Sequence, residues 1–223
     1  MSIDIVNSHC HTLSVSRHLT EQAVDEFRGQ LCRVAARRFA EFGHAGLTLR
    51  ALAQELGCSR TTPYRYFRDK EQILWAVRAE GFLLLAQAQE AAALSEPDVE
   101  RRLQAVGRAY LRFAHDERDY YRLMFEVPDK SSSKPSPEQV TVVERSQRPL
   151  YEAVKAAAAA GLLEGNPTTV THLLWAALHG VISLHLADKL ALGRTFEQLS
   201  EEMLNLLSRL TRARSRDNSR QES

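Results

Sequence analysis

Residues Thr48 to Lys70, TLRALAQELGCSRTTPYRYFRDK, contain the pattern that decides the fold. Thr48 can cap a helix, because its hydroxyl can accept a hydrogen bond from an amide of the first turn. Apolar residues then recur at helical spacing as far as Leu56, and Gly57 fits the left-handed position that commonly ends a helix. Ser59 can cap a second helix only two residues later. A turn this short between two helices predicts a helix-turn-helix.

The second helix of this pair, predicted over about 60–67, carries side chains suited to DNA. Hydroxyl and basic groups at or near its N-terminal end can reach base edges and phosphates in a major groove. These side chains belong to Arg60, Thr61, Thr62, Tyr64 and Arg65. Phe67 and Leu56 are apolar and are expected to hold the second helix against the first.

An amphipathic helix is predicted upstream, over 21–42. Apolar residues recur there every three to five positions, while arginines and glutamates fill the other faces. Gly43 fits the end of this helix. The helix can pack across the helix-turn-helix and complete a three-helix DNA-binding unit over 21–68.

Length and charge limit the classes of protein. With 223 residues and 44% hydrophobic content, the chain can bury a substantial core. Its net charge of +1 argues against binding nucleic acid through overall basicity, so DNA contact must rest on a local patch. Residues 48–70 supply such a patch, with five basic residues against two acidic ones.

The first 20 residues are interpreted as a flexible leader, because they lack helical periodicity and are too polar for a signal peptide. Residues of types that ligate transition metals occur there, but the Ser- and Thr-rich context favours a leader, and we expect no metal site. These residues are His9, Cys10, His11 and His18. Cys10, Cys32 and Cys58 are widely spaced and odd in number, which is typical of reduced intracellular thiols. No run approaches the roughly 18 apolar residues of a membrane span, so we expect a cytoplasmic protein.

Residues 69–212 are predicted to form a larger helical domain, which opens with a connector helix over 69–94. The other predicted helices cover 98–115, 120–125, 138–160, 167–192 and 195–212, with a loop at 128–137. The helix over 167–192 is apolar on more than one side, and the last helix has the near-heptad spacing of a helix-helix seam. One face of each is therefore left for another subunit. A basic, disordered tail is expected over 213–223.

Four short motifs carry a resemblance to a known family. They are TLRALA at 48–53, GCSR at 57–60, YRYF at 64–67 and DKE at 69–71. In this order and spacing, the segment from about 24 to 77 resembles the DNA-binding domain of TetR-family transcriptional regulators. Pro63 departs from the family, which more often has an aliphatic residue there. Proline is tolerated in the first turn of a helix, but further along it would kink the helix.

The C-terminal part looks like the family's C-terminal subtype marked by Trp, His and Gly, through YRLMF at 121–125 and WAALHG at 175–180. The resemblance implies an all-α homodimer that pairs through the helices at 167–192 and 195–212, with a small-molecule pocket in each C-terminal domain. The expected function is that of a repressor that binds a palindromic operator in double-stranded DNA and is released by an effector.

Two alternatives stay open. The C-terminal cavity could serve a helical-bundle enzyme or a small-molecule carrier, with the helix-turn-helix incidental, or DNA binding could operate without any effector. The sequence contains no nucleophile elbow, phosphate loop, HExxH or paired-cysteine pattern. We therefore expect no catalytic residue and no cofactor.

The candidate DNA contacts differ in what they are suited to bind. Arg60 can bind a guanine edge or a phosphate, Tyr64 a phosphate through its hydroxyl, and Lys70 the DNA backbone at a helix N-terminus. Thr48 is explained equally well as a cap, and Tyr66 as a packing residue. A solvated basic surface is the alternative for the whole set, which is Thr48, Arg60, Thr61, Thr62, Tyr64, Arg65, Tyr66 and Lys70.

Aromatic and polar residues of the C-terminal helices are the candidates for an effector pocket, because a cavity needs apolar walls and a few polar groups. The candidates are Phe113, Tyr120, Met124, Phe125, Trp175 and His179. Most such residues at helical spacing belong to a core. His179, beside Gly180 on an apolar helix, is better explained as a hydrogen-bonded structural histidine.

Overall fold

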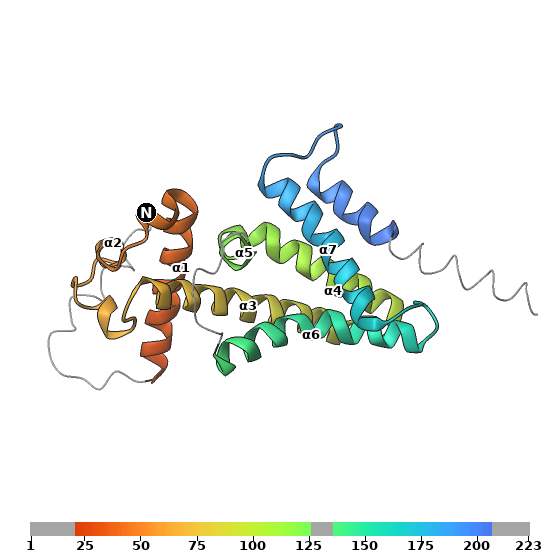
Figure 1. Ribbon diagram of the computed structural model, residues 1–223, viewed down its shortest axis with the longest axis horizontal. Helices are drawn as coiled ribbons and strands as arrows, with labels where there is room; N and C mark the ends of the chain where they lie inside the picture. The colour runs from red at the N-terminus through yellow and green to blue at the C-terminus, as the bar shows by residue number, and fades with distance from the viewer. Residues whose placement is uncertain (1–20, 126–135, 207–223) are drawn as a thin grey trace, which may run out of the picture. The chain divides into compact units, whose positions relative to one another are not determined.

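The computed structural model describes residues 21–125 and 136–206, and within these residues all the regular secondary structure is helical (Figure 1). The predicted all-α class is therefore confirmed. The leader with its His and Cys residues, the basic tail and most of the loop at 128–137 lie outside the described residues. The elements are α1 (Glu21–Gly46), α2 (Leu49–Glu55), the 3-10 turn η1 (Pro63–Arg65), α3 (Lys70–Ser95), α4 (Val99–Asp116), α5 (Arg118–Phe125), α6 (Pro137–Ala159) and α7 (Pro167–Leu186). A last helical segment covers 196–206.

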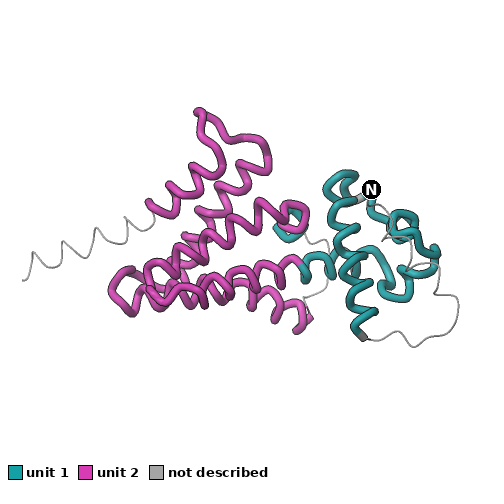
Figure 2. Tube along the Cα trace, turned by 180° about the vertical axis from the view of Figure 1, so that it is seen from behind, with its two compact units in different colours: residues 1–80, 122–132 teal, residues 81–121, 133–223 magenta. Residues whose placement is uncertain are grey.

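The chain divides into two compact units, which Figure 2 colours separately. Of the described residues, 21–80 and 122–125 belong to the first unit, and 81–121 and 136–206 belong to the second. The divisions fall inside α3 and α5, so these two helices each contribute to both units.

In the first unit, α1 and α2 pack against each other around a small apolar core. Leu31 of α1, Leu52 of α2 and Phe67 are almost completely buried. Gly43 breaks the helical geometry of α1 with a φ of 62°, a left-handed conformation that glycine adopts without steric cost. The main helical run of α1 therefore stops at the predicted residue.

Both ends of α2 follow the prediction. The Thr48 hydroxyl accepts a hydrogen bond from the Ala51 amide at 3.1 Å, as expected of a cap. Gly57 has a φ of 63°, and the next amide, that of Cys58, donates to the carbonyl of Ala53 at 3.0 Å. This is the Schellman arrangement that satisfies the last carbonyls of a helix.

The second helix of the helix-turn-helix is shorter than the predicted 60–67. Only η1, a single 3-10 turn, forms there, although the Thr61 amide still donates to the Ser59 hydroxyl at 3.4 Å. Pro63 has no amide hydrogen, so it cannot donate to the Ser59 carbonyl as an α-helical residue would. The Thr62 amide donates to that carbonyl instead, at 2.9 Å. The helical turn consequently begins at the proline.

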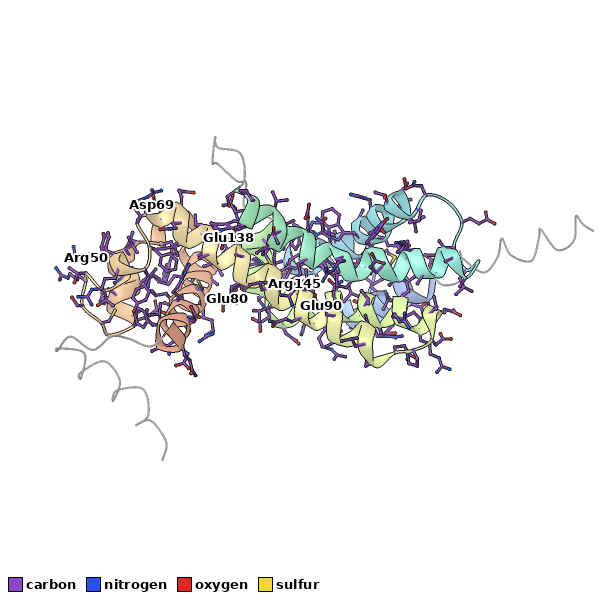
Figure 3. The ribbon with its side chains drawn as sticks, turned by 90° about the horizontal axis from the view of Figure 1, so that it is seen from below. Arg50, Asp69, Glu80, Glu90, Glu138 and Arg145 are labelled. Carbon is purple, nitrogen blue, oxygen red and sulfur yellow. The ribbon has the colours of Figure 1, made fainter. Side chains whose placement is uncertain are left out.

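In the second unit, α4, α6 and α7 share one apolar core. Val106 of α4, Leu150 and Val154 of α6, and Leu174 of α7 are buried in the same cluster. At the surface of the unit, Arg145 of α6 forms an ion pair with Glu90 of α3 at 2.9 Å, and Figure 3 labels both side chains. These contacts make the second unit a packed helical bundle.

The helix predicted over 167–192 ends six residues early, at Leu186. It begins as expected, because Asn166 accepts a hydrogen bond from the Thr169 amide at 3.2 Å and Pro167 occupies the first turn. At its end, Asp188 adopts a φ of 52°, and the Lys189 amide donates to the Leu184 carbonyl at 2.8 Å. An aspartate therefore takes the left-handed position that glycine most often occupies at a helix end.

The last helix starts at the predicted place. Thr195 and Gln198 form a reciprocal capping box, in which each side chain accepts a hydrogen bond from the other residue's amide. The remainder of the helix predicted over 195–212 lies outside the described residues. Of the described helices, α7 alone has a length and composition that would suit a membrane span, a test that core helices of soluble proteins also pass.

Candidate DNA interface and buried polar network

The end of the helix-turn-helix presents exposed basic and hydroxyl side chains. Arg60, Thr61 and Arg65 are exposed, and Tyr64 keeps 58% of its surface accessible. An aromatic side chain this exposed beside two arginines does not contribute to a core. The position and the residue types instead suit contact with phosphates and base edges.

Two further exposed arginines lie within residues 48–70, and the sequence pattern marked them only as part of the local basic charge. Arg50 points outward from α2 in Figure 3, and the side chain of Arg68 is 86% accessible. Nothing in the sequence pattern separated them from a solvated helix face, because exposure depends on how the helix packs. They extend the basic surface on which DNA contact would rest.

Aromatic packing holds the turn in place. Phe67 is buried beneath the guanidinium of Arg28, which lies 5.5 Å from its ring centre. Tyr66 packs on Phe27, with 4.9 Å between ring centres. The packing interpretation of Tyr66 thus has direct support, while a phosphate contact through its hydroxyl stays a prediction.

Hydroxyl groups fix the local geometry on both sides of the turn. The Thr48 hydroxyl accepts the Ala51 amide, yet it can still donate its own hydrogen to a phosphate. The Thr61 hydroxyl lies 2.9 Å from that of Ser59, and Thr62 is half-buried. Of these threonines, Thr48 and Thr61 are therefore placed where DNA could reach them.

The start of α3 places opposite charges side by side. Asp69 caps the helix through a hydrogen bond from the Gln72 amide at 2.9 Å, and it forms an ion pair with Arg68 at 3.1 Å. These contacts, led by the Gln72 amide, hold the pKa of Asp69 below its usual value. Lys70, the candidate backbone contact, is half-buried as the first residue of α3.

Glu55 at the end of α2 ties the unit together by binding Arg37 and Arg38 of α1. Partial burial alone would raise the pKa of Glu55, but the hydrogen bonds from the two arginines outweigh it and lower the pKa below the usual value. The two arginines are thereby held on α1 rather than left available to a phosphate.

In the second unit, four polar side chains form a hydrogen-bond chain, in which the two tyrosines are buried and Trp175 and His179 are half-buried. The indole N–H of Trp175 donates to the Tyr110 hydroxyl at 2.9 Å, which lies 2.8 Å from the Tyr121 hydroxyl. The Tyr121 hydroxyl in turn lies 2.5 Å from Nδ1 of His179. Burial raises the pKa of Tyr110 to about 12, so the phenol stays neutral. The hydrogen-bond chain links α4, α5 and α7.

The predicted pocket residues are only partly gathered here. Trp175 and His179 belong to the chain, and the structure shows His179 to be hydrogen-bonded, as the structural interpretation expected. Phe113 and Tyr120 are buried in the second unit, whereas Met124 and Phe125 fall in the first. Tyr110 and Tyr121 were not predicted as site residues, because the spacing of each matches the apolar face of an amphipathic helix.

A helix-turn-helix with an exposed basic end, continuous with a separate helical bundle, defines a helical DNA-binding regulator. Residues 31–77 match the family described as bacterial regulatory proteins, tetR family, and residues 103–207 match the tetracyclin repressor-like C-terminal domain. The chain belongs to the TetR family, whose named relatives are transcriptional regulators and not enzymes. The subtype marked by Trp, His and Gly stays a prediction.

Relatives of known role support this assignment. The HTH-type transcriptional repressor AcnR of Corynebacterium efficiens is 32% identical over 180 residues, which span 78% of this chain and 87% of the relative. The HTH-type transcriptional activator FasR of Mycolicibacterium smegmatis is 29% identical over 102 residues, which span 46% of this chain and 47% of that protein. The named relatives thus include both a repressor and an activator of transcription.

Solved structures share the fold. A protein of unknown function from Rhodococcus sp. RHA1 is 28% identical with a TM-score of 0.71, covering 82% of this chain and 93% of that one. FadR from Bacillus subtilis, solved in complex with stearoyl-CoA, is 15% identical with a TM-score of 0.68, covering 81% and 97% respectively. At that identity, the second comparison speaks for the fold alone.

Proposed function

We propose that this regulator is a ligand-responsive repressor that binds a palindromic operator as a homodimer and leaves it when a small molecule binds. The observation that carries the DNA-binding part is the exposed set Arg60, Tyr64 and Arg65 on a turn held against α2. One such turn reads one half-site, so two copies related by a two-fold axis match a palindrome. The relationship to the repressor AcnR favours repression.

The proposed dimer uses the helices at 167–192 and 195–212. Within this region, α7 exposes large apolar side chains, since Leu173 is 65% and Leu184 50% accessible. A Cβ placed on Gly180, between them in sequence, would meet no atom within 4 Å. Small and apolar residues exposed along one helix are typical of a surface covered by a partner helix. Only about a third of α7 is buried within the protomer, which leaves room for this role.

The proposed effector site lies at the buried polar chain of the second unit. Trp175 and His179 combine aromatic surface with hydrogen-bonding groups, which is what recognition of a mostly apolar molecule with one polar end requires. An effector would act by binding more tightly to the conformer that does not fit the operator, because only differential affinity shifts a population. A regulator that binds an operator in this way works in the cytoplasm, and we therefore propose a cytoplasmic location.

The first test of the proposal is a gel shift with DNA from upstream of the protein's own gene, at moderate salt. We expect a complex that competitor DNA of scrambled sequence does not displace. Absence of a sequence-specific complex would contradict the proposed repressor.

Effector response is tested separately by thermal shift with a panel of acyl-CoA thioesters and aromatic acids. A stabilising compound should also dissociate the DNA complex. If no compound stabilises the protein while DNA binding is intact, the alternative of a regulator without an effector is favoured.

A further inference from the structure

Three aromatic rings meet where the last helix begins. Phe196, the first residue of that helix, stacks on His185 of α7 with 4.3 Å between ring centres. It also stacks on His115 of α4 at 5.6 Å, and the two imidazoles stack on each other at 5.5 Å. Phe196 is buried, so this ring cluster forms part of the core beneath the last helix.

The ring cluster is one end of a seam between α4 and the last helix. Further along, Arg108 forms a bidentate ion pair with Glu201 at 3.0 Å. Beyond it, a Cβ placed on Gly107 would lie 2.6 Å from Leu204, so the two helices approach closely there. Along this seam the residue numbers increase on the last helix while they decrease on α4. The two helices therefore run antiparallel.

The ring cluster is poorly equipped to hold positive charge. Nδ1 of His115 is buried and has no hydrogen-bond partner among the described residues. If Nδ1 is protonated, its N–H becomes a buried donor without an acceptor, which costs more free energy than leaving the nitrogen unprotonated. Two imidazolium rings 5.5 Å apart would also repel each other, because this distance lies within the screening length of about 8 Å at physiological ionic strength.

The surrounding charges act in both directions. Arg118 at the start of α5 disfavours a positive charge on His185, whereas Asp188 after α7 and Glu197 on the last helix favour that charge. Burial is the largest influence, and with the charge of His115 it lowers the pKa of His185 below its ordinary 6.5. The same two histidines lower the pKa of Glu197, after the contributions of its own amide and of Thr195. The folded arrangement therefore favours the neutral His185 ring.

We infer that the stacked rings of His115, His185 and Phe196 form an acid-sensitive latch that holds the N-terminal end of the last helix against α4 and α7. Protonation of His185 releases this end of the helix. The Arg108–Glu201 pair does not respond in the same pH range, since its hydrogen bonds hold the pKa of Glu201 below the usual value. The latch therefore loses stability as the pH falls below about 6.5, the ordinary pKa at which a released His185 ring takes up a proton, and the seam opens from the Phe196 end.

A consequence for assembly rests on the proposed function. If the last helix supplies part of the homodimer surface, release of its first turns weakens the dimer and hence the operator complex. Acidification would then act in the same direction as the proposed effector, but from a different site.

The test is amide hydrogen exchange over 196–206 in the full chain, measured at about pH 7.5 and about pH 5.5 and corrected for the intrinsic exchange rate. We expect protection of this segment to fall about tenfold at the lower pH. The double variant His115→Gln, His185→Gln should show no such fall, because nothing in the ring cluster then titrates. His172→Gln is the matched control, since His172 is an exposed histidine of the same helix α7 and should leave the fall intact.

Equal protection of the wild-type segment at both pH values would overturn the latch. So would an unchanged fall in the double variant. If circular dichroism shows that the double variant is not folded, His185→Gln alone must reduce the fall. Sedimentation at the two pH values reports the dimer separately, so a protein that is monomeric throughout would refute the proposed dimer while the exchange data still decide on the latch.

Discussion

The hydroxyl groups of Tyr110 and Tyr121 lie 2.8 Å apart in a buried hydrogen bond that joins α4 to α5. The Tyr110 oxygen also accepts the indole N–H of Trp175, so this phenol bonds to partners on two different helices. The hydrogen-bond chain therefore runs from Trp175 on α7, through the two phenols, and back to His179 on the same helix. Removal of one link affects the groups on both sides of it.

Tyr110→Phe should destabilise the protein by about 1–3 kcal/mol, because it removes the acceptor of the half-buried Trp175 N–H and the hydrogen-bond partner of the buried Tyr121 hydroxyl. Urea unfolding followed by circular dichroism measures the change. Tyr151→Phe is the control, since Tyr151 is half-buried on α6 and takes no part in this chain; we expect a change within about 0.5 kcal/mol there. Equal effects of the two substitutions would show that the chain contributes nothing to stability.

Local signals predicted most helix ends correctly, because a cap involves residues three or four apart. Thr48 is a cap in the structure as predicted, and Asn166 and Thr195 cap the helices that were predicted to begin at 167 and 195. The misplaced ends have local causes too, but of a kind that the usual rules rank low. Pro63 removed the donor that would have started an α-helix at that point, and Asp188 took a conformation expected of glycine.

The polar chain and the ring cluster were beyond sequence reasoning for a different reason. Tyr121 and His179 are 58 residues apart, and Trp175 and Tyr110 are 65 apart. No spacing rule connects residues at such separations, because their contact depends on how α4, α5 and α7 pack. Trp175 and His179 were predicted as candidates for an effector pocket, but their tyrosine partners were not, because they resembled ordinary core residues.

Glu55→Gln should cost about 0.5–1 kcal/mol of stability at about pH 7, because it removes a charge shared by Arg37 and Arg38. The folded pKa of Glu55 is lowered, so its ionised form is favoured by folding. The contribution is complete above its ordinary pKa of 4.5 and is lost as the pH falls through the lower, folded value. Urea unfolding at about pH 7 and about pH 3 should therefore show a difference between variant and wild type that shrinks in acid. Glu41→Gln, at an exposed position of α1, should show no such pH-dependent difference.

Arg60→Ala and Lys70→Ala should weaken operator binding in distinguishable ways. Lys70→Ala should weaken binding to all sequences alike and reduce the slope of log K against log salt by about one, as loss of one phosphate contact requires. Arg60→Ala should also relax base preference if Arg60 binds a guanine edge. Gel shifts over a salt series with specific and scrambled DNA separate the two effects. Arg112→Ala, an exposed arginine of α4 in the other unit, should leave both quantities unchanged; affinities unaltered in all three variants would remove the assigned contacts.

Leu184→Glu should convert the proposed dimer into monomers. The side chain is half-exposed on α7, and in a two-fold interface the substitution occurs twice. Burying a polar group without a partner costs at least about 2 kcal/mol, so two copies raise the dimer dissociation constant about a thousandfold. Sedimentation equilibrium measures this directly.

Leu94→Glu is the matched control, because Leu94 is 88% exposed at the end of α3 and lies outside the proposed surface. It introduces the same charge and should leave the dimer intact. The monomeric Leu184 variant should also lose most of its affinity for a palindrome, since each protomer then binds only one half-site and no longer gains from the tethered second contact. A Leu184→Glu protein that stays dimeric would place the interface elsewhere, whereas a monomer that binds the full operator undiminished would show that dimerisation is not needed for recognition.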